Sequence, residues 1–182
     1  MTDIVMLNQM INNNARIVLT NKYKKAYVEL IEPNQPESKV QIQGLPQDAV
    51  VIKIDDAFQN DSFFSCKNGE CKRADYVIVA ETYTKKVILF IEIKKTTKSK
   101  AHIIKQLKGA ACAMNYCSEI AKVFYGRDKF LSDYEKRFIT FGHTGIRKRK
   151  TRIQRNKSTH DSPEKMMIID WPANIQFAHL AG

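Results

Sequence analysis

The sequence predicts one α/β domain in which a central mixed β-sheet is flanked by helices. Its 182 residues are enough for one domain with a sizeable core and too few for two comfortable ones. Apolar runs of strand length lie on both sides of a segment with helical spacing at residues 101–122, and no internal repeat or low-complexity linker divides them. We therefore treat residues 1–182 as a single domain, with residues 75–80 and 87–94 as the central strands.

The first part of the chain is expected to form one short helix followed by strands. An amphipathic helix is expected over residues 3–13, where apolar residues recur at helical spacing: Ile4, Leu7, Met10 and Ile11. Four β-leaning runs follow, at residues 16–20, 26–31, 40–43 and 50–54. Residues 55–73 are polar and are expected to form a loop.

The centre of the chain has the strongest patterns. Residues 75–80 are expected to form a strand that begins with Asp75. After a short turn, residues 87–94 form an almost continuous apolar run, as in a strand that is buried on both faces. The helix at residues 101–122 comes next. Further strands are expected at residues 137–142, 166–170 and 175–178.

The chain is strongly basic, with 30 Lys and Arg against 19 Asp and Glu, a net charge of +11 and a pI near 9.5. Such an excess favours polyanions, meaning nucleic acid or an anionic membrane surface. No stretch approaches the roughly 20 apolar residues that span a bilayer, and the N-terminus lacks the features of a signal peptide. The sequence thus predicts a cytoplasmic protein without a membrane partner.

Four cysteines occur as two pairs, Cys66 with Cys71 and Cys112 with Cys117. In the cytoplasm we expect all four to be reduced. Each pair is separated by four residues, whereas zinc knuckles usually have two residues between their cysteines. Small buried or loop thiols are therefore favoured over a zinc site, which stays open as the alternative.

Two polar residues interrupt the apolar central strand near its end. Glu92 and Lys94 are two residues apart, so they project from the same face. Asp75 begins the neighbouring strand, and its carboxylate can meet that of Glu92 on one Mg²⁺ (or Mn²⁺) ion, with the backbone carbonyl of Ile93 as a further ligand. Lys94 could then polarise an attacking water and stabilise negative charge on a phosphate.

These residues resemble the signature of the PD-(D/E)xK restriction-endonuclease-like superfamily. The resemblance covers about residues 70–120 and comprises Arg73-Ala74-Asp75-Tyr76-Val77-Ile78, Phe90-Ile91-Glu92-Ile93-Lys94 and Gln106-Leu107. It implies a restriction-endonuclease-like core and metal-dependent endonuclease activity on DNA, in defence, restriction or repair. It also implies that Asp75, Glu92 and Lys94 form the active site, with Gln106 as a catalytic residue of the following helix. Members of this family often act as homodimers, so the resemblance also implies a homodimer.

Two positions depart from the pattern. Ala74 stands where the family's name-giving proline would be, which leaves the chemistry of the aspartate intact. The acid that the first helix often supplies has no clear counterpart: Asp3 is too close to the terminus, and the other candidates are Glu29, Glu32, Asp55 and Asp56. Which of them completes a second metal site is left open.

A basic arm at residues 145–160 follows the strand at residues 137–142. Its cations lack compensating acids and are expected to contact phosphates: Arg147, Lys148, Arg149, Lys150, Arg152 and Arg155. Lys95, Lys98 and Lys100 are expected to extend a positive rim around the candidate site. DNA is therefore the expected partner.

Two other functions fit the same residues. The chain could be a catalytically inactive nucleic-acid-binding module on the same fold, or a basic protein-interaction domain in which Glu92 and Lys94 form a plain salt bridge.

Overall fold

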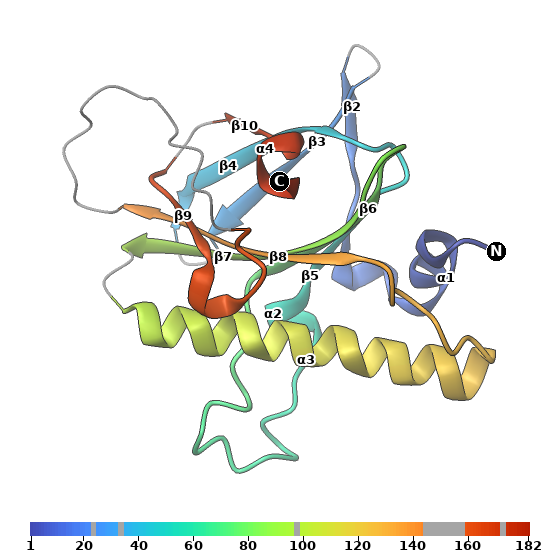
Figure 1. Ribbon diagram of the computed structural model, residues 1–182. Helices are drawn as coiled ribbons and strands as arrows, with labels where there is room; N and C mark the ends of the chain where they lie inside the picture. Colours follow the sequence, from blue (N-terminus) through green and yellow to red (C-terminus); the bar gives the residue numbers. More distant parts are fainter. Residues whose placement is uncertain (23–24, 33–34, 97–98, 144–158, 172–173) are drawn as a thin grey trace.

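The computed structural model describes the chain from Met1 to Gly182 except residues 23–24, 33–34, 97–98, 144–158 and 172–173. Its strands form two sheets (Figure 1). The six-stranded sheet has the order β1 (Arg16–Ile17), β5 (Val50–Lys53), β6 (Tyr76–Glu81), β7 (Lys86–Thr96), β8 (Glu135–His143) and β9 (Met167–Ile169). The four-stranded sheet has the order β10 (Asn174–Gln176), β4 (Gln35–Leu45), β3 (Lys25–Glu32) and β2 (Thr20–Lys22).

The larger sheet is mixed, with β6 and β7 at its centre. β5, β6 and β7 pair antiparallel, whereas β7, β8 and β9 pair parallel. The expected α/β class and the two central strands are thereby confirmed.

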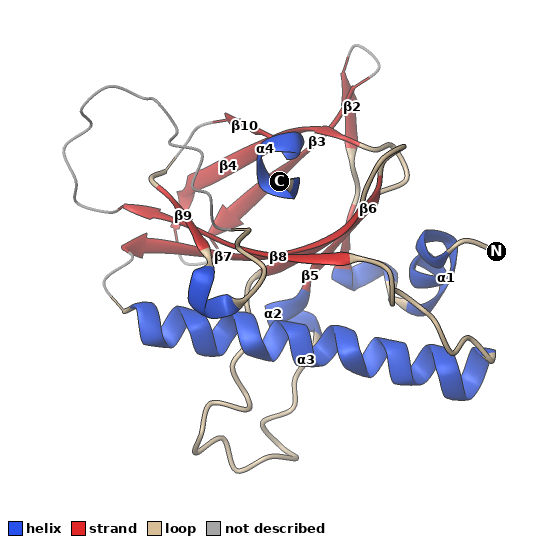
Figure 2. Cartoon of the chain, viewed as in Figure 1, coloured by secondary structure: helices blue, strands red, loops and turns tan. Residues whose placement is uncertain are grey.

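The helices are of very unequal length (Figure 2). They are α1 (Asp3–Met10), α2 (Ile54–Ala57), α3 (Lys100–Tyr125) and α4 (Phe177–Ala181), with short 3-10 helices at Asn13–Ala15 and Pro163–Lys165. α3 lies along one face of the larger sheet, where its apolar side packs on alternate residues of β6 and β7 such as Val77 and Phe90. It ends at Gly126, whose left-handed backbone (φ 63°) lets its N–H reach the carbonyl of Ala121.

The opposite face of the larger sheet is covered by the second sheet and α4. The remaining residues of β6 and β7, such as Ile78 and Leu89, pack there against apolar side chains of β3 and β4, such as Leu30 and Ile42. Burial on both faces explains why the sequence of β7 is apolar almost throughout. The sequence predicted helices as the flanking elements, and on this face a second sheet, which was not predicted, supplies most of the cover.

Two short helices also differ from the sequence prediction. α2 occupies the beginning of the expected polar loop, and residues 177–181 are helical although residues 175–178 were expected to be extended. Both helices have only four or five residues. Runs of this length do not show whether apolar residues repeat with the helical or the strand period.

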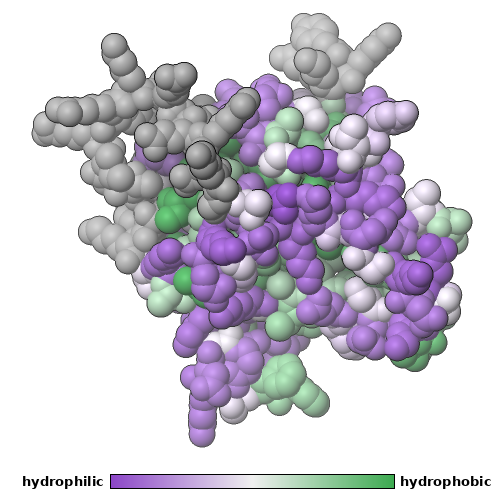
Figure 3. Space-filling view, viewed as in Figure 1, coloured by the Kyte–Doolittle hydropathy of each residue, from purple (hydrophilic) through white to green (hydrophobic). Residues whose placement is uncertain are grey.

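No helix in the described ranges is both long enough and apolar enough to cross a bilayer. Hydrophilic residues predominate on the face seen in Figure 3, where apolar patches are small and separate.

Candidate active site

Asp75 and Glu92 lie side by side at one end of the β6–β7 pair. Tyr76 pairs with Ile91, which sets Asp75 opposite Glu92 one step further along the antiparallel ladder. Because Val77 and Phe90 face α3 and side chains alternate along a strand, both acids face α3 too. Lys94 follows on the same face of β7. The structure thus brings together the three residues that the sequence singled out.

Hydrogen bonds fix both carboxylates. The backbone N–H of Asp75 donates to Oε2 of Glu92 at 3.2 Å, and the N–H of Ile93 donates to Oδ2 of Asp75 at 2.6 Å. Nζ of Lys94 lies 2.5 Å from Oε1 of Glu92. In a ladder the N–H and C=O of one residue point to the same neighbouring strand. The carbonyl of Ile93 is therefore also directed to the Asp75 side.

The acids are deeply buried, and burial governs their protonation. Asp75 is 4% exposed and Glu92 0% exposed. Loss of hydration raises the pKa of Asp75 to about 7, against the opposing effects of the Ile93 N–H and the Lys94 ammonium. Burial and then the Asp75 charge raise the pKa of Glu92 well above its ordinary value. Two carboxylates with only one adjacent ammonium cannot both ionise without cost.

Burial by itself lowers the pKa of Lys94, but the charge and hydrogen bond of Glu92, with the charges of Asp75 and Glu32, outweigh it and raise the pKa. Lys94 therefore stays charged. Its side chain is partly open to solvent, so the ammonium can also meet an incoming anion.

Two buried oxygen atoms of this region accept or donate no hydrogen bond within the described residues. They are Oε1 of Gln106 and Oγ1 of Thr140. Gln106 is buried and donates through Nε2 to the carbonyl of Arg73 at 3.4 Å, which holds it two residues from Asp75. Thr140 is the β8 neighbour of Glu92 and shares the α3-facing side with Phe138. Unsatisfied buried polar atoms are rare and costly, so this group calls for a ligand.

Thr140 was not among the residues that the sequence predicted. The available signal was a lone hydroxyl between the apolar residues Ile139 and Phe141 of an expected strand. Its proximity to Glu92 depends on the β7–β8 register, which local sequence does not specify.

The four acids considered for a second metal site fall into two groups. Glu29 forms an exposed ion pair with Lys39, and Asp56 forms one with Lys53. Glu32 is buried, although it belongs to the other sheet, and one of its oxygens has no hydrogen-bond partner in the described residues. Glu32 and Asp55 each lie close enough to Asp75 for their charges to raise its pKa.

Tyr76 links the two sheets at this point. Its hydroxyl donates to the carbonyl of Ile31 at 2.6 Å and accepts from the N–H of Ile31 at 3.3 Å. This contact brings the end of β3, where Glu32 lies, to the start of β6. Within the described residues, however, no three His, Cys, Asp or Glu side chains are close enough together to hold one metal ion. A metal at Asp75 and Glu92 would depend on backbone oxygens, water and substrate for its other ligands.

Most of the expected phosphate-binding cations fall outside the described residues. Lys98, the side chain of Lys95 and the arm residues do so, namely Arg147, Lys148, Arg149, Lys150, Arg152 and Arg155. Lys100 is exposed at the first residue of α3. A further cationic cluster, absent from the sequence prediction, surrounds His102: burial and then the charges of Lys72, Lys94 and Lys105 lower its pKa.

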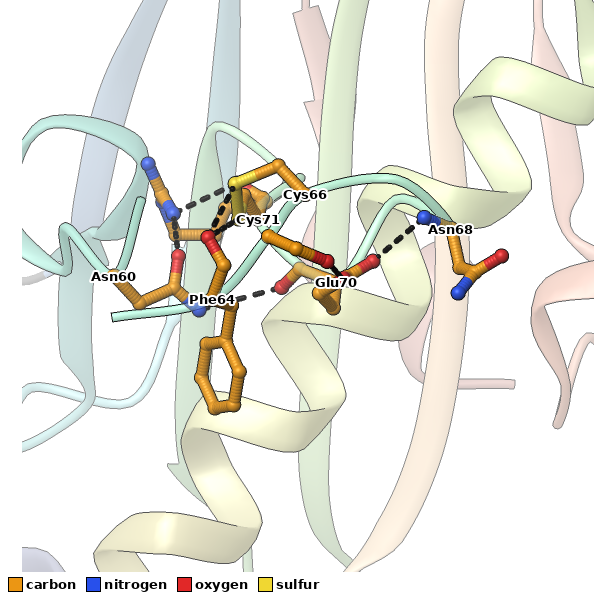
Figure 4. Close-up of a disulfide and its surroundings, with 8 residues drawn as sticks. Asn60, Phe64, Cys66, Asn68, Glu70 and Cys71 are labelled. Carbon is orange, nitrogen blue, oxygen red and sulfur yellow. Dashed lines mark hydrogen bonds between the residues drawn. A yellow bond between two sulfur atoms is a disulfide. The ribbon is translucent and has the colours of Figure 1, made fainter. Parts of the chain in front are cut away.

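The expectation that all four cysteines are reduced is wrong for the first pair. Cys66 and Cys71 form a disulfide (Figure 4). Cys112 and Cys117 are free thiols on α3. The sequence argument relied on the expected compartment, whereas the loop between α2 and β6 brings these two cysteines together. Their pairing also removes them as ligands of a zinc site.

Comparisons of the chain with protein-family models, with curated proteins and with solved structures find no match. The resemblance to the PD-(D/E)xK superfamily therefore remains a prediction from the residues themselves.

Proposed function

We propose that this chain is a metal-dependent endonuclease that hydrolyses phosphodiester bonds in DNA, on a restriction-endonuclease-like core. The observation that carries the proposal is the Asp75–Glu92 pair. Both carboxylates are buried, hydrogen-bonded to the neighbouring backbone and short of cationic partners. Such a pair is costly for stability, which favours a functional reason for keeping it.

The residues fit Mg²⁺ or Mn²⁺ better than a softer metal. Asp75, Glu92 and the Ile93 carbonyl offer oxygen atoms only, and Mg²⁺ is commonly held by one or two carboxylates, with waters and substrate phosphates completing its shell. Oε1 of Glu92 already faces a cation, the Lys94 ammonium at 2.5 Å, so this carboxylate lies where positive charge is favoured. When bound, the ion would supply positive charge and a more acidic water.

The remaining residues would orient and neutralise the substrate. Lys94 holds Glu92 at one side and is partly open to solvent, so its ammonium can stabilise charge on a phosphate oxygen. Gln106 is fixed by the Arg73 carbonyl and has a carbonyl oxygen that can accept a hydrogen bond from a positioned water. Glu32 or Asp55 is suited to a second cation because each lies within electrostatic range of Asp75.

The basic residues would hold the DNA backbone. Lys95, Lys98, Lys100 and the arm at residues 147–155 carry charge suited to phosphate contacts. In this proposal the protein acts in the cytoplasm, in defence, restriction or repair.

The test is incubation of the purified protein with supercoiled plasmid and Mg²⁺ or Mn²⁺, with an EDTA control. We expect nicked or linear products only with metal, and none from Asp75→Ala. Binding of Asp75→Ala to duplex DNA should survive. A protein that binds DNA but never cleaves it would instead be an inactive binding module. One that shows no salt-dependent DNA binding would be a protein-interaction domain.

A further inference from the structure

The loop between α2 and β6 exposes two phenylalanines beside the candidate active site. It extends beyond α3, away from the sheet (Figure 1). Phe63 is 83% exposed and Phe64 46% exposed, and their rings meet edge to face with centroids 4.9 Å apart. We call these two residues the aromatic tip. Exposed clusters of large apolar side chains commonly mark binding surfaces.

The loop that carries the aromatic tip is closely braced. The N–H groups of Phe63 and Phe64 both donate to the carbonyl of Asn60 at 3.1 Å, and Nη1 of Arg73 donates to Oδ1 of Asn60 at 2.5 Å. The Cys66–Cys71 disulfide closes the loop, and Figure 4 shows the Phe64 ring pointing away from it. A braced loop loses little conformational entropy when a ligand binds.

Glycine lets the same loop sit directly on α3. A Cβ on Gly109 would lie 1.6 Å from the carbonyl oxygen of Lys72, so only glycine permits this approach of helix and loop. Arg73 then bonds to Gln106, two residues before Asp75. The position of the aromatic tip is therefore fixed relative to the candidate active site.

Cations gather around His102, a residue of the first turn of α3. Nζ of Lys72 lies 3.4 Å from Nε2 of His102, and the charges of Lys94 and Lys105 also reach this imidazole. Glu70, an acid of the loop, is occupied within it, because its carboxylate accepts from the N–H of Asn68 at 2.8 Å and from the hydroxyl of Ser65 at 3.1 Å. An anionic ligand is thus favoured over a basic or purely apolar protein surface.

We propose that Phe63 and Phe64 stack on unpaired bases of a nucleic-acid strand whose phosphates lie on Lys72 and Lys105. The inference rests on the proposed function and specifies its substrate: DNA with a single-stranded segment, such as a flap or a bubble. Aromatic faces stack on any base, while adjacent cations hold the backbone, which is the usual design of single-strand binding. Bases inside an intact duplex are already stacked on each other and do not offer a free face.

The experiment measures binding in EDTA, which prevents cleavage, by fluorescence anisotropy. The probes are an oligonucleotide of about 20 nucleotides and its duplex, and the test variant is Phe63→Ala/Phe64→Ala. Phe124→Ala is the matched control, because Phe124 is 76% exposed at the far end of α3. All three side chains project into solvent, so both variants should fold, and their thermal melting is compared with that of the unmodified protein.

We expect the double variant to bind the single strand about 5- to 100-fold more weakly, which corresponds to one stacked base, and to bind the duplex within about twofold of the unmodified protein. The slope of log K against log salt should not change, because no cation is removed. Cys66→Ser/Cys71→Ser, which frees the loop, should give a smaller loss of the same selective kind. Phe124→Ala should bind both probes normally.

Three results would overturn the inference. Unchanged single-strand binding by the double variant removes the stacking role. Equal losses on both probes make the loop a general support. Self-association of the unmodified protein that disappears in the double variant assigns the aromatic tip to a second copy of the chain. Plasmid cleavage is scored separately, so selective binding without cleavage would refute only the nuclease proposal.

Discussion

The two ends of the β6–β7 pair differ in how their charged groups are buried and paired. At one end, Asp75 and Glu92 are buried with a single ammonium between them. At the other end, charges are matched in ion pairs: partly exposed Lys86 lies 2.9 Å from exposed Asp133, and partly exposed Arg127 lies 3.1 Å from Asp3, whose side chain is 11% exposed. An open polar depression of about 530 Å³ is lined by this second group, yet it contains no strained carboxylate pair.

Protonation separates the two ends. The pKa of Asp133 is lowered by its hydrogen bond to Lys86, as for an ordinary surface ion pair, whereas burial raises that of Asp75 to about 7. Surface pairs of this kind contribute about 0–1 kcal/mol and need no further reason. A raised pKa in a buried pair shows that the ionised carboxylate destabilises the fold, and such groups are usually retained because they have a function. The end of the sheet that has the depression is therefore the less informative one.

The largest expected effect is on cleavage. Asp75→Asn keeps an oxygen to accept the Ile93 N–H but removes the charge, so we expect plasmid cleavage to fall by about 10³-fold or more. Loss of a group that merely orients a metal ligand already costs about 10–100-fold. Asp133→Asn at the opposite end is the control and should cleave normally. Equal rates for the two variants would abolish the functional distinction between the ends.

Lys94→Ala should reduce turnover by about 10²–10³-fold, since it removes charge stabilisation near the phosphate. Its effect on metal affinity should be much smaller, because Lys94 is not a ligand. Turnover is measured at saturating Mg²⁺, and affinity by the Mg²⁺ concentration that gives half-maximal rate. Lys86→Ala, which removes the lysine at the other end, is expected to match the unmodified protein. Should Lys94→Ala cleave as fast as that control, Lys94 has no part in catalysis.

The pH dependence of stability should also differ between the ends. The pKa of Asp75 is about 7 in the folded protein, against 3.8 for an unperturbed aspartate, so the folded state holds an extra proton between these limits. Stability therefore falls as pH rises from about 4 to 7 in EDTA. Asp75→Asn removes this loss and should raise the free energy of unfolding at pH 8 by about 1–4 kcal/mol.

Asp133→Asn should act in the other direction. Its pKa is lowered by Lys86, so the carboxylate stabilises the fold above its unfolded pKa and its loss should cost about 0–1 kcal/mol at pH 8. Denaturant titrations at pH 4 and pH 8 measure both variants. If Asp75→Asn were destabilising at pH 8, the carboxylate would be well paired in solution and the contrast would be lost.

Sequence alone predicted the parts of this site whose patterns are long and local. β6, β7 and α3 could be predicted because their apolar runs are long enough to distinguish a helical repeat from a strand repeat. The alternation of side chains along a strand could also have distinguished Glu32 from Glu29. Val28 and Leu30 are buried, and Glu32 lies at the same alternate positions of β3 as they do. Two features could not be predicted: the cover of the second face of the sheet and the position of Thr140 beside Glu92. Both depend on pairing between segments that are distant in the sequence. The Cys66–Cys71 disulfide was missed because the oxidation state of the cysteines was inferred from the expected cellular compartment.

The smallest expected effect concerns the hydroxyl of Thr140. Its Oγ1 is buried without a hydrogen-bond partner in the described residues, so Thr140→Val, which keeps the shape, removes an unpaid desolvation cost. We expect the metal-free protein to gain about 1 kcal/mol in its free energy of unfolding.

Thr82, near the other end of the sheet, is the matched control. Its hydroxyl oxygen accepts from the N–H of Lys85 at 2.9 Å, so Thr82→Val should instead lose about 0.5–1 kcal/mol. Both values come from denaturant unfolding in EDTA. A loss of stability in Thr140→Val would show that its hydroxyl is satisfied in solution. Opposite signs for the two threonines would show that the Thr140 hydroxyl, beside Glu92, is unsatisfied, whereas the Thr82 hydroxyl at the other end is satisfied.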